Sequence, residues 1–348
     1  MFQRRPFNYS DRAHFVGHSL VAPRVKVVYM PTTKSACSSI KMMLAEANDS
    51  YRPDNARYLH SPNISIAQTI HQIEVNGLQF FRYLDTALQD EIWESPDWWR
   101  VGALRHPYAR TYSAFENRIL MRAPSVLSEE VWDFCGDDRV DGNIDIASTF
   151  RRFVHALRGR PDLFFVDDHF TAQWGSVRDD HVRYTHFFRV DKSGEMDRFA
   201  RELSERAGRS ITPKRLNEGL GIKYRDVMDA HTAALIEEIY ADDFARYGFE
   251  KEIFPTEPIK LVATTRETRA IDYARVGAAV GSTAPARFCA TRVFAVDYRV
   301  ARPTSTNDPA PERLTVLGGI IRRANCSQLA LATWRNGLRS GLQSRLSG

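Results

Sequence analysis

A short apolar run, a tight loop and an amphipathic segment, in that order near the N-terminus, constrain the fold more than any other feature. Residues 25–30 read Val-Lys-Val-Val-Tyr-Met, which is typical of a buried strand. Pro31 ends this run, and Ser38 and Ser39 suit the N-cap of a helix. The apolar residues that follow recur at helical spacing, at Ile40, Met43, Leu44 and Ala47. This segment therefore predicts a strand, a loop and a helix in direct succession.

The same order of elements recurs further along the chain. Residues 98–104 predict a second strand, and Pro107 stands where the first residue of a helix is expected. An apolar stripe then follows at helical spacing, at Tyr108, Tyr112, Phe115 and Ile119. Two such units favour an α/β fold, in which helices pack on a parallel sheet.

Further elements complete this arrangement. We expect helices at about 145–158, 194–207 and 226–247, and a strand at 187–190. Gly248 suits the C′ position that ends the last of these helices.

The composition changes after about residue 255. Between 261 and 348 there are 13 arginines, no lysine and five acidic residues, although the whole chain of 348 residues carries a formal net charge of only +5. The first 260 residues hold 35 basic and 38 acidic side chains, so they are slightly acidic. We expect one domain over 20–252 and a weakly structured, Arg-rich extension of unknown role over 253–348. A small additional module and a shifted reading frame are the alternatives for the extension.

Charge, cysteines and hydropathy exclude several classes of protein. The mild positive charge permits an anionic ligand but does not call for nucleic acid. The four cysteines are far apart and form no CxxC pair, so we expect neither a metal site nor a disulfide framework. No stretch approaches the roughly 20 apolar residues of a membrane helix, and the N-terminus lacks the apolar core of a secretory signal. We expect a cytoplasmic protein, with peripheral association at a membrane left open.

The loop after the first predicted strand has the features of an anion site. The N–H groups and the dipole of a helix N-terminus attract phosphate or sulfate. Lys34 adds a mobile positive charge, and Ser38 and Ser39 add hydroxyl donors. The glycines of a Walker A loop are missing, which argues against a nucleotide-dependent phosphotransferase.

The segment after the second predicted strand carries a sharper anion signal. Pro107 biases His106 toward an extended conformation, so Arg105 should lie at the C-terminal end of the strand. Ligands of parallel α/β sheets collect at that edge. Arg110 and Ser113 follow on the polar face of the helix, and an arginine beside a serine hydroxyl suits a dianionic phosphate. A structural ion pair is an equal alternative for Arg110.

The two segments together resemble the carbohydrate sulfotransferases that use 3′-phosphoadenosine 5′-phosphosulfate (PAPS), a sulfotransferase family 2-like group that includes enzymes acting on chondroitin and dermatan. That family carries a Pro-Lys-x-Ala-Cys-Thr-Ser-like loop and an Arg-x-Pro-x-x-Arg-x-x-Ser segment. The residues that match the loop are Lys34, Ala36, Cys37, Ser38 and Ser39, and those that match the segment are Arg105, Pro107, Arg110, Ser113, Ala114 and Phe115.

The likeness spans about 20–250. Residues 168–173 resemble a family His-aromatic-x-x-Gln segment, 187–191 resemble a strand that ends in an acid, and 240–248 resemble the closing helix. Thr33 stands where the family usually has proline, and Ser38 replaces a threonine, but neither change removes a needed chemical group. The membrane anchor of Golgi members is absent, which favours a soluble enzyme of bacterial type.

The resemblance implies a P-loop-like parallel sheet flanked by helices and the in-line transfer of a sulfuryl group from PAPS to a hydroxyl of a carbohydrate or glycolipid acceptor, without a metal. Lys34 would lie near the leaving phosphate and the sulfuryl group. Arg105 and Ser113 would hold the 3′-phosphate. The loop that would cradle the 5′-phosphosulfate comprises Lys34, Ser35, Ala36, Cys37, Ser38 and Ser39.

The acceptor hydroxyl needs a general base, which family members supply as a His or Glu between the two loops. His71 shortly precedes Asn-Gly-Leu at 76–78, as in a family segment, and is the preferred candidate. Glu74 lies three residues later, so on a helix it could orient the imidazole or act as the base itself. His60 is the second choice, and His169 is more typical of an acceptor site.

Two other functions stay open from the sequence: a non-catalytic nucleotide- or glycan-binding protein on the same fold, and a nucleotide-dependent phosphotransferase. Lys34 and Arg105 are both present, which disfavours a decayed site. The acceptor cannot be identified because acceptor specificity depends on loops that vary most between relatives.

Overall fold

A five-stranded sheet with the order β3-β1-β2-β4-β6 lies at the centre of the fold. The structure, a computed structural model, describes residues 18–58, 69–120, 127, 130–131, 135, 143–180, 182–216, 219–257, 259–268, 295–301 and 314–316. The strands of this sheet are β1 (Leu20–Ala22), β2 (Val27–Met30), β3 (Gln79–Phe80), β4 (Trp99–Leu104) and β6 (His186–Arg189). Strands β2, β4 and β6 are parallel, whereas β1 pairs antiparallel with β2 and with β3. The predicted fold class, a parallel sheet flanked by helices, is confirmed, with two short antiparallel strands added at one edge.

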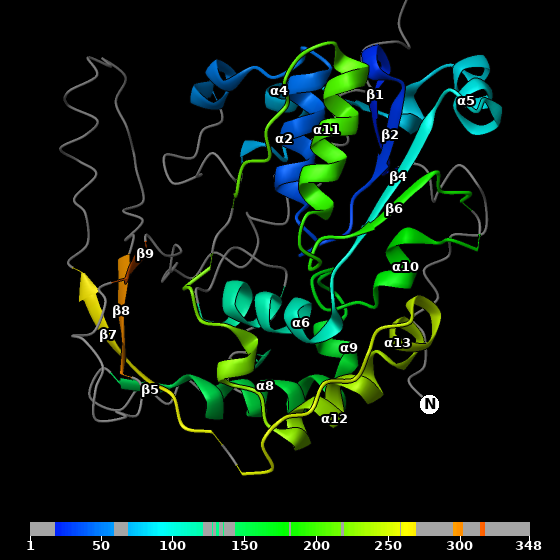
Figure 1. Cartoon of the computed structure of the whole chain (residues 1–348). Coiled ribbons are helices and arrows are strands. Elements are labelled where there is room, and N and C mark those ends of the chain that lie inside the picture. Colours follow the sequence, from blue (N-terminus) through cyan, green and yellow to red (C-terminus); the bar gives the residue numbers. More distant parts are fainter. Residues whose placement is uncertain are drawn as a thin grey trace, which may run out of the picture.

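Both predicted strand–loop–helix units are present (Figure 1). Strand β2 leads into α2 (Cys37–Ala47), and β4 leads into α6 (Pro107–Phe115), which begins at proline as predicted. Helix α6 continues into one turn of π-helix, η4 (Glu116–Leu120). The predicted serine N-cap of α2 is wrong. The N-cap is Ala36 in the left-handed region, and Ser38 and Ser39 lie in the first helical turn.

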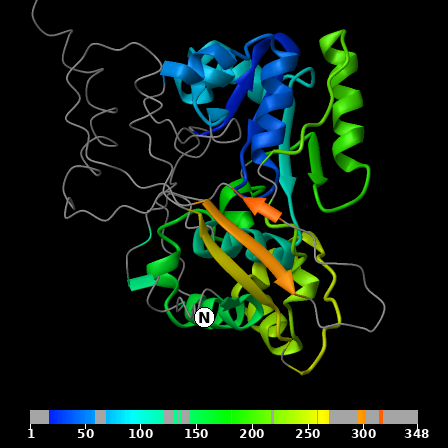
Figure 2. The same ribbon diagram turned by 90° about the vertical axis from the view of Figure 1, so that its left-hand side faces the viewer.

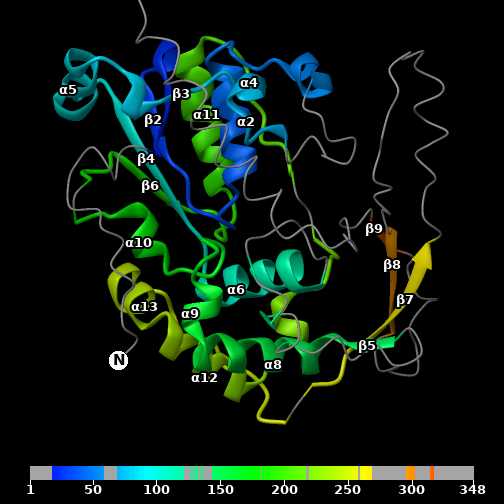
Figure 3. The same ribbon diagram turned by 180° about the vertical axis from the view of Figure 1, so that it is seen from behind.

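The two faces of the sheet are covered by different helices. Val27 and Tyr29 of β2 pack in one cluster with α2 and α11 (Glu195–Ala207). Val28 and Met30 point to the other face, where α5 (Thr86–Glu94) packs against them. Figure 3 shows α5 on the far side of β4 from α2 and α11. Successive side chains of β2 point to opposite faces of the sheet, and both faces are buried, so this strand is apolar throughout.

A layer of helices below the sheet forms the largest core cluster. Figure 1 shows α6 between the sheet and this layer, which comprises α8 (Ile146–Gly159), α9 (Pro161–Phe164), α12 (Ala230–Ile239) and α13 (Ala241–Tyr247). Aromatic rings fill the interface, and Phe115 lies 5.0 Å from Phe150 and 5.3 Å from Phe153 between ring centroids. The apolar stripe predicted on α6 is therefore the face that packs on this layer.

The last predicted helix is two helices. Tyr240 has φ −112° and ψ 31°, which separates α12 from α13, and its hydroxyl donates to the carbonyl of Phe170 at 2.7 Å. Gly248 ends α13 with φ 60°, as predicted.

Several elements were not predicted: helices α5 and α9, strands β1 and β3, and the four strands of a second sheet. The other unpredicted elements are short: η1 (Pro23–Val25), η2 (Pro53–Tyr58), α4 (Ile73–Asn76), η3 (Phe81–Tyr83), α10 (Gln173–Val177) and η5 (Tyr224–Asp226).

A second sheet joins the domain to the C-terminal extension. It has the order β5-β7-β8-β9, with β5 (Asn143–Asp145), β7 (Val262–Thr268), β8 (Ala295–Ala301) and β9 (Leu314–Val316), all antiparallel. Figure 2 shows β7 and β8 side by side.

The chain stays packed on the domain beyond residue 252, since Phe254 and Leu261 are buried in the large core cluster. Most of the extension beyond 268 lies outside the described residues, so its weak structure and the boundary at 252 stay predictions.

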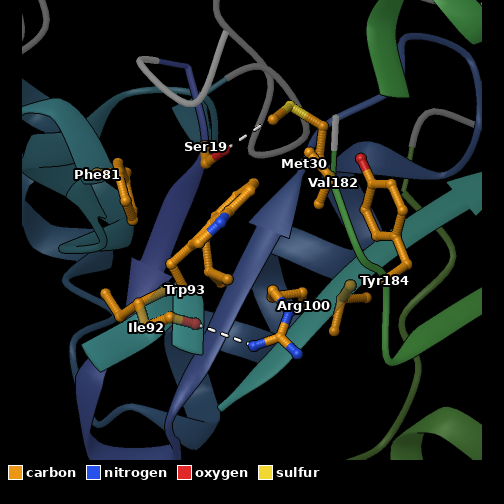
Figure 4. Close-up of a pocket in the computed structure, with 10 residues that line it drawn as sticks. Ser19, Met30, Phe81, Ile92, Trp93, Arg100, Val182 and Tyr184 are labelled. Carbon is orange, nitrogen blue, oxygen red and sulfur yellow. Dashed lines mark hydrogen bonds between the residues drawn. The ribbon is translucent and has the colours of Figure 1, made fainter. Parts of the chain in front are cut away.

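A small pocket lies on the face of the sheet that α5 covers (Figure 4). Ile92 and Trp93 of α5 line it together with Val28 and Met30 of β2. Arg100 is held beside it, because its guanidinium donates to the carbonyl of Ile92 at 3.0 Å. None of the predicted site residues lines this pocket.

Candidate active site

The two predicted anion loops meet at one edge of the sheet. Strands β2 and β4 run parallel, with Met30 paired to Gly102, so the loops that follow them leave at the same edge. The guanidinium of Arg105 donates to the carbonyl oxygen of Lys34 at 3.3 Å. Arg105 directly follows β4, as we predicted from the position of Pro107 two residues later. The structure therefore brings together the two residues on which the sequence prediction depended most.

The first loop has an unusual backbone. Lys34 and Ala36 have φ values of 61° and 57°, in the left-handed region that glycine normally occupies. The turns that they impose are those that glycines provide in other phosphate-binding loops. Ala36 offers no side-chain cap to α2, and the buried hydroxyl of Thr32 has no partner among the described residues. Such a loop fits an anion that accepts these donors.

The cations of the site are crowded. Partial burial, followed by repulsion from Arg105, lowers the pKa of Lys34 to about 8, although the nearby Cys37 opposes this. Burial also lowers the pKa of Arg105, with Arg110 adding to the effect. An anion placed between Lys34 and Arg105 would relieve this repulsion. The electrostatics thus favour the polyanionic ligand that the resemblance implies.

Glu116 is a site residue that sequence reasoning missed. Its carboxylate is buried at the start of the π-helical turn and accepts the N–H of Leu220 at 2.7 Å. Burial raises the pKa of Glu116, while the charges of Lys34 and Arg105 pull it down. A Cβ at Gly219 would overlap the carboxylate, so a glycine is required there. The carboxylate partly balances the two cations.

Arg110 has a structural role, through hydrogen bonds to neutral oxygens and not through the ion pair that the sequence left open. Its side chain is 1 % exposed, and its guanidinium donates to oxygens of Thr33, Thr171 and Asp168. Its Nε donates to the carbonyl of Thr33 at 3.0 Å and its Nη1 to that of Thr171 at 2.7 Å. Nη2 donates to the carbonyl of Asp168 at 3.2 Å. Arg110 therefore fastens the first loop to the segment around residue 170.

His71 lies against the first helix. Lys41 Nζ lies 2.9 Å from Nδ1 of His71, and Ser38 Oγ lies 2.9 Å from Nε2. An ammonium group can only donate, so Nε2 carries the ring proton and donates to Ser38. The residue as a whole is exposed, but desolvation of the ring, followed by the charge of Lys41, lowers the pKa of His71 to about 3.

His169 lies in the same cluster with a different tautomer. Its Nδ1 lies 2.6 Å from the carboxylate of Asp167, which is 5 % exposed, and Nδ1 donates to it. Arg118 also contacts Asp167, with its Nε 3.0 Å from Oδ2, and its Nη2 lies 3.2 Å from Nε2 of His169. Burial lowers the pKa of His169 to about 4, although its hydrogen bond to Asp167 acts in the opposite direction. The charges of Lys34 and Arg118 act on both imidazoles.

The remaining candidates lie apart or are engaged elsewhere. The shared helical face of His71 and Glu74 is wrong, because α4 begins at Ile73 and His71 precedes it. Glu74 is exposed. Ser113 lies on α6, partly exposed, and His60 lies outside the described residues.

The loop serines face the protein. Ser38 and Ser39 are buried in the first turn of α2. The hydroxyl of Ser35 is buried and donates to Gln173 at 3.2 Å, while its N–H donates to the carbonyl of Thr32 at 3.3 Å.

Neither a metal cluster nor a membrane span is found in the part of the chain that the structure describes. There, no group of three or more His, Cys, Asp or Glu side chains could hold a metal ion. No helix among the described residues is long and apolar enough to cross a membrane.

The sheet and its paired, cation-rich loops define an α/β protein with a candidate anion site at the carboxyl edge of its parallel strands. A model of the sulfotransferase family matches residues 17–250, more than half of the chain, so the chain belongs to the sulfotransferase family. The family transfers sulfuryl groups, and the range agrees with the likeness found from the motifs. No curated protein and no solved structure matches the chain.

Proposed function

We propose that this sulfotransferase takes its sulfuryl group from PAPS and transfers it to a hydroxyl of a carbohydrate or glycolipid acceptor. The observation that carries the proposal is the meeting of Lys34 and Arg105 at one sheet edge, where the two half-buried cations repel each other. The loop residues after each strand are those that bind the two phosphate ends of PAPS in related enzymes.

The protein's own groups supply binding and charge stabilisation. The N–H groups at the start of α2, together with Lys34, bind the 5′-phosphosulfate. Arg105 and Ser113 bind the 3′-phosphate. PAPS supplies the sulfuryl group, and the positive charge of Lys34 stabilises the leaving phosphate. A bound anion raises the pKa of Lys34, so its charge is complete when it is needed.

Removal of the acceptor proton requires a basic imidazole nitrogen that the acceptor hydroxyl can reach. In the free protein a cation donates to this nitrogen in both candidates: Lys41 to Nδ1 of His71, and Arg118 to Nε2 of His169 at 3.2 Å. The difference lies at the other nitrogen, because Nδ1 of His169 donates to the Asp167 carboxylate, whereas Nε2 of His71 donates to Ser38. The carboxylate orients His169 and raises its basicity, which favours His169 as the base, with Arg118 exchanged for the acceptor hydroxyl, and His71 as a support for Ser38.

The experiment that tests this function is transfer of radiolabelled sulfate from PAPS to a panel of polysaccharides, glycolipids and small glycosides. We expect label in at least one carbohydrate with the wild-type protein and none with Lys34→Ala. Binding of adenosine 3′,5′-bisphosphate (PAP) without transfer to any acceptor would instead favour a non-catalytic binding protein. Transfer of phosphate from ATP would favour a phosphotransferase.

A further inference from the structure

We propose that Gln173 is a positioning residue that fixes the separation of the two phosphate-binding loops, so that the two ends of one nucleotide are bound cooperatively. This inference rests on the proposed use of PAPS, whose two phosphate ends are bound by different loops. It concerns a side chain that no step of the mechanism uses.

The side-chain amide of Gln173 contacts both loops at once and so forms a bridge between them. Its Oε1 accepts the backbone N–H of Arg105 at 2.9 Å and the hydroxyl of Ser35 at 3.2 Å. Its Nε2 donates to the carbonyl of Arg105 at 2.9 Å. Gln173 is fully buried, so none of these bonds competes with water. A primary amide is needed, because one end must accept and the other must donate.

These bonds act on the residues that face the ligand. Both backbone groups of Arg105 are held, which fixes where the second loop leaves the sheet. Ser35 directly follows Lys34, so the other end of the bridge fixes the first loop. The direct bond from Arg105 to the carbonyl of Lys34, at 3.3 Å, is longer than each of the three bonds of the amide. Gln173 is therefore the firmer connection between the loops.

Gln173 is itself anchored from a third element. Its N–H and that of Trp174 donate to the two carboxylate oxygens of Asp243, each at 2.9 Å. Asp243 is fully buried on α13. The carboxylate thus caps α10 and sets where the Gln173 side chain begins. Each loop is therefore positioned relative to the helical layer as well as to the other.

A ligand with two anionic ends benefits from this rigidity, because loops already at the right separation need no ordering when it binds. A ligand that binds to only one loop gains nothing from a fixed separation between the loops. The ratio between the affinity for PAP and the affinity for a monophosphate therefore reports the effect of Gln173 on this separation, apart from any damage to a single loop.

The test compares three nucleotides by calorimetry: PAP, adenosine 5′-monophosphate and adenosine 3′-monophosphate. We expect Gln173→Leu to lower the affinity for PAP roughly 10-fold or more and to change the affinity for each monophosphate by less than about 2-fold. Gln89→Leu is the matched control, since Gln89 also donates to two backbone carbonyls, those of Phe81 and Leu84, but lies on α5 away from the loops. It should leave all three affinities unchanged.

Gln173→Met, which keeps most of the length of the side chain, provides a second variant if Gln173→Leu does not fold. It removes the amide bonds to Ser35 and Arg105 and should weaken the affinity for PAP to a similar extent, again without loss of affinity for the monophosphates. Equal losses for PAP and the monophosphates, or an unchanged affinity for PAP, would overturn the inference. A wild-type protein that binds no PAP at all would overturn the proposed function instead.

Discussion

At the scale of single residues, the site depends on a few placed cations and not on a basic surface. The first 260 residues are slightly acidic, and the positive charge of the chain belongs to the extension. We expect Lys34 and Arg105 to bind an anion because the backbone brings them together at a partly buried edge. Burial disfavours the charged form of both groups, and Arg105 adds repulsion at Lys34, so a bound anion would offset both effects.

Lys34 predicts a pH dependence of nucleotide binding. Its pKa of about 8 lies below the usual value, so the free site loses this charge as the pH rises through 8. The affinity for PAP should be steady below pH 7.5 and fall above pH 8, by up to about tenfold per pH unit. Titration calorimetry between pH 7 and pH 10 checks this. Lys34→Arg, which keeps its charge throughout, should remove the decline, and a decline that persists in this variant would contradict the assignment.

The two histidines should differ in what they contribute. We expect His169→Ala to lower kcat about 100-fold to 10,000-fold with little change in PAP affinity, which is the range for loss of a general base. Asp167→Asn should lower kcat as well, since it removes the carboxylate that orients the ring. His71→Ala should mainly weaken PAP binding, because it removes the hydrogen bond between His71 and Ser38. Steady-state kinetics and PAP binding on the three variants decide this, and loss of kcat in His71→Ala alone would restore His71 as the base.

Single residues also show where sequence reasoning ends. Lys34 and Arg105 could be predicted because each follows an apolar strand, and strand ends of parallel sheets meet. Glu116 and Gln173 could not be assigned roles, because their partners lie far away in the chain, at Leu220 for Glu116 and at Ser35 for Gln173. The tautomers of His71 and His169 likewise depend on neighbours that only the fold supplies.

At the scale of elements, most of the long and regular segments were predictable, with α5 as an exception, and the short ones were not. Strand β4 and helices α2 and α6 have apolar patterns that match their geometry. Strand β1 has three residues and forms only by pairing with β2 and β3. The break at Tyr240 also has a tertiary cause, since its hydroxyl bonds to Phe170.

The contrast between two arginines of the second segment tests this arrangement of elements. Arg110→Met leaves the carbonyl oxygens of Thr33, Thr171 and Asp168 without the donors that the buried Arg110 side chain supplies, so it should lower the free energy of unfolding by about 3 kcal/mol. Arg105→Ala removes one side-chain hydrogen bond, to the carbonyl of Lys34, so it should lower that free energy by about 1 kcal/mol, and it should abolish PAP binding. Urea unfolding measures the first effect and calorimetry the second. The reverse outcome would exchange the roles of the two residues.

At the scale of the whole molecule, the domain and the extension can be separated by proteolysis. Phe254 and Leu261 are buried in the large cluster, and the carbonyl of Leu261 accepts the N–H of Ile146 at 2.8 Å. A protected fragment should therefore end after Leu261, and the Arg-rich part beyond it should be cut first. Limited trypsin digestion with mass spectrometry identifies the end. A stable fragment that ends before Phe254, or resistance throughout, would contradict this expectation.

The central claim is that the two loops together form the binding site of one bisphosphorylated nucleotide. The most direct measurement is the melting temperature of the full chain with PAP and, separately, with ATP and Mg²⁺. PAP should raise the melting temperature by mass action, more than ATP does, and Arg105→Ala should abolish the increase. No shift with millimolar PAP, or a larger shift with ATP and Mg²⁺, would contradict the claim.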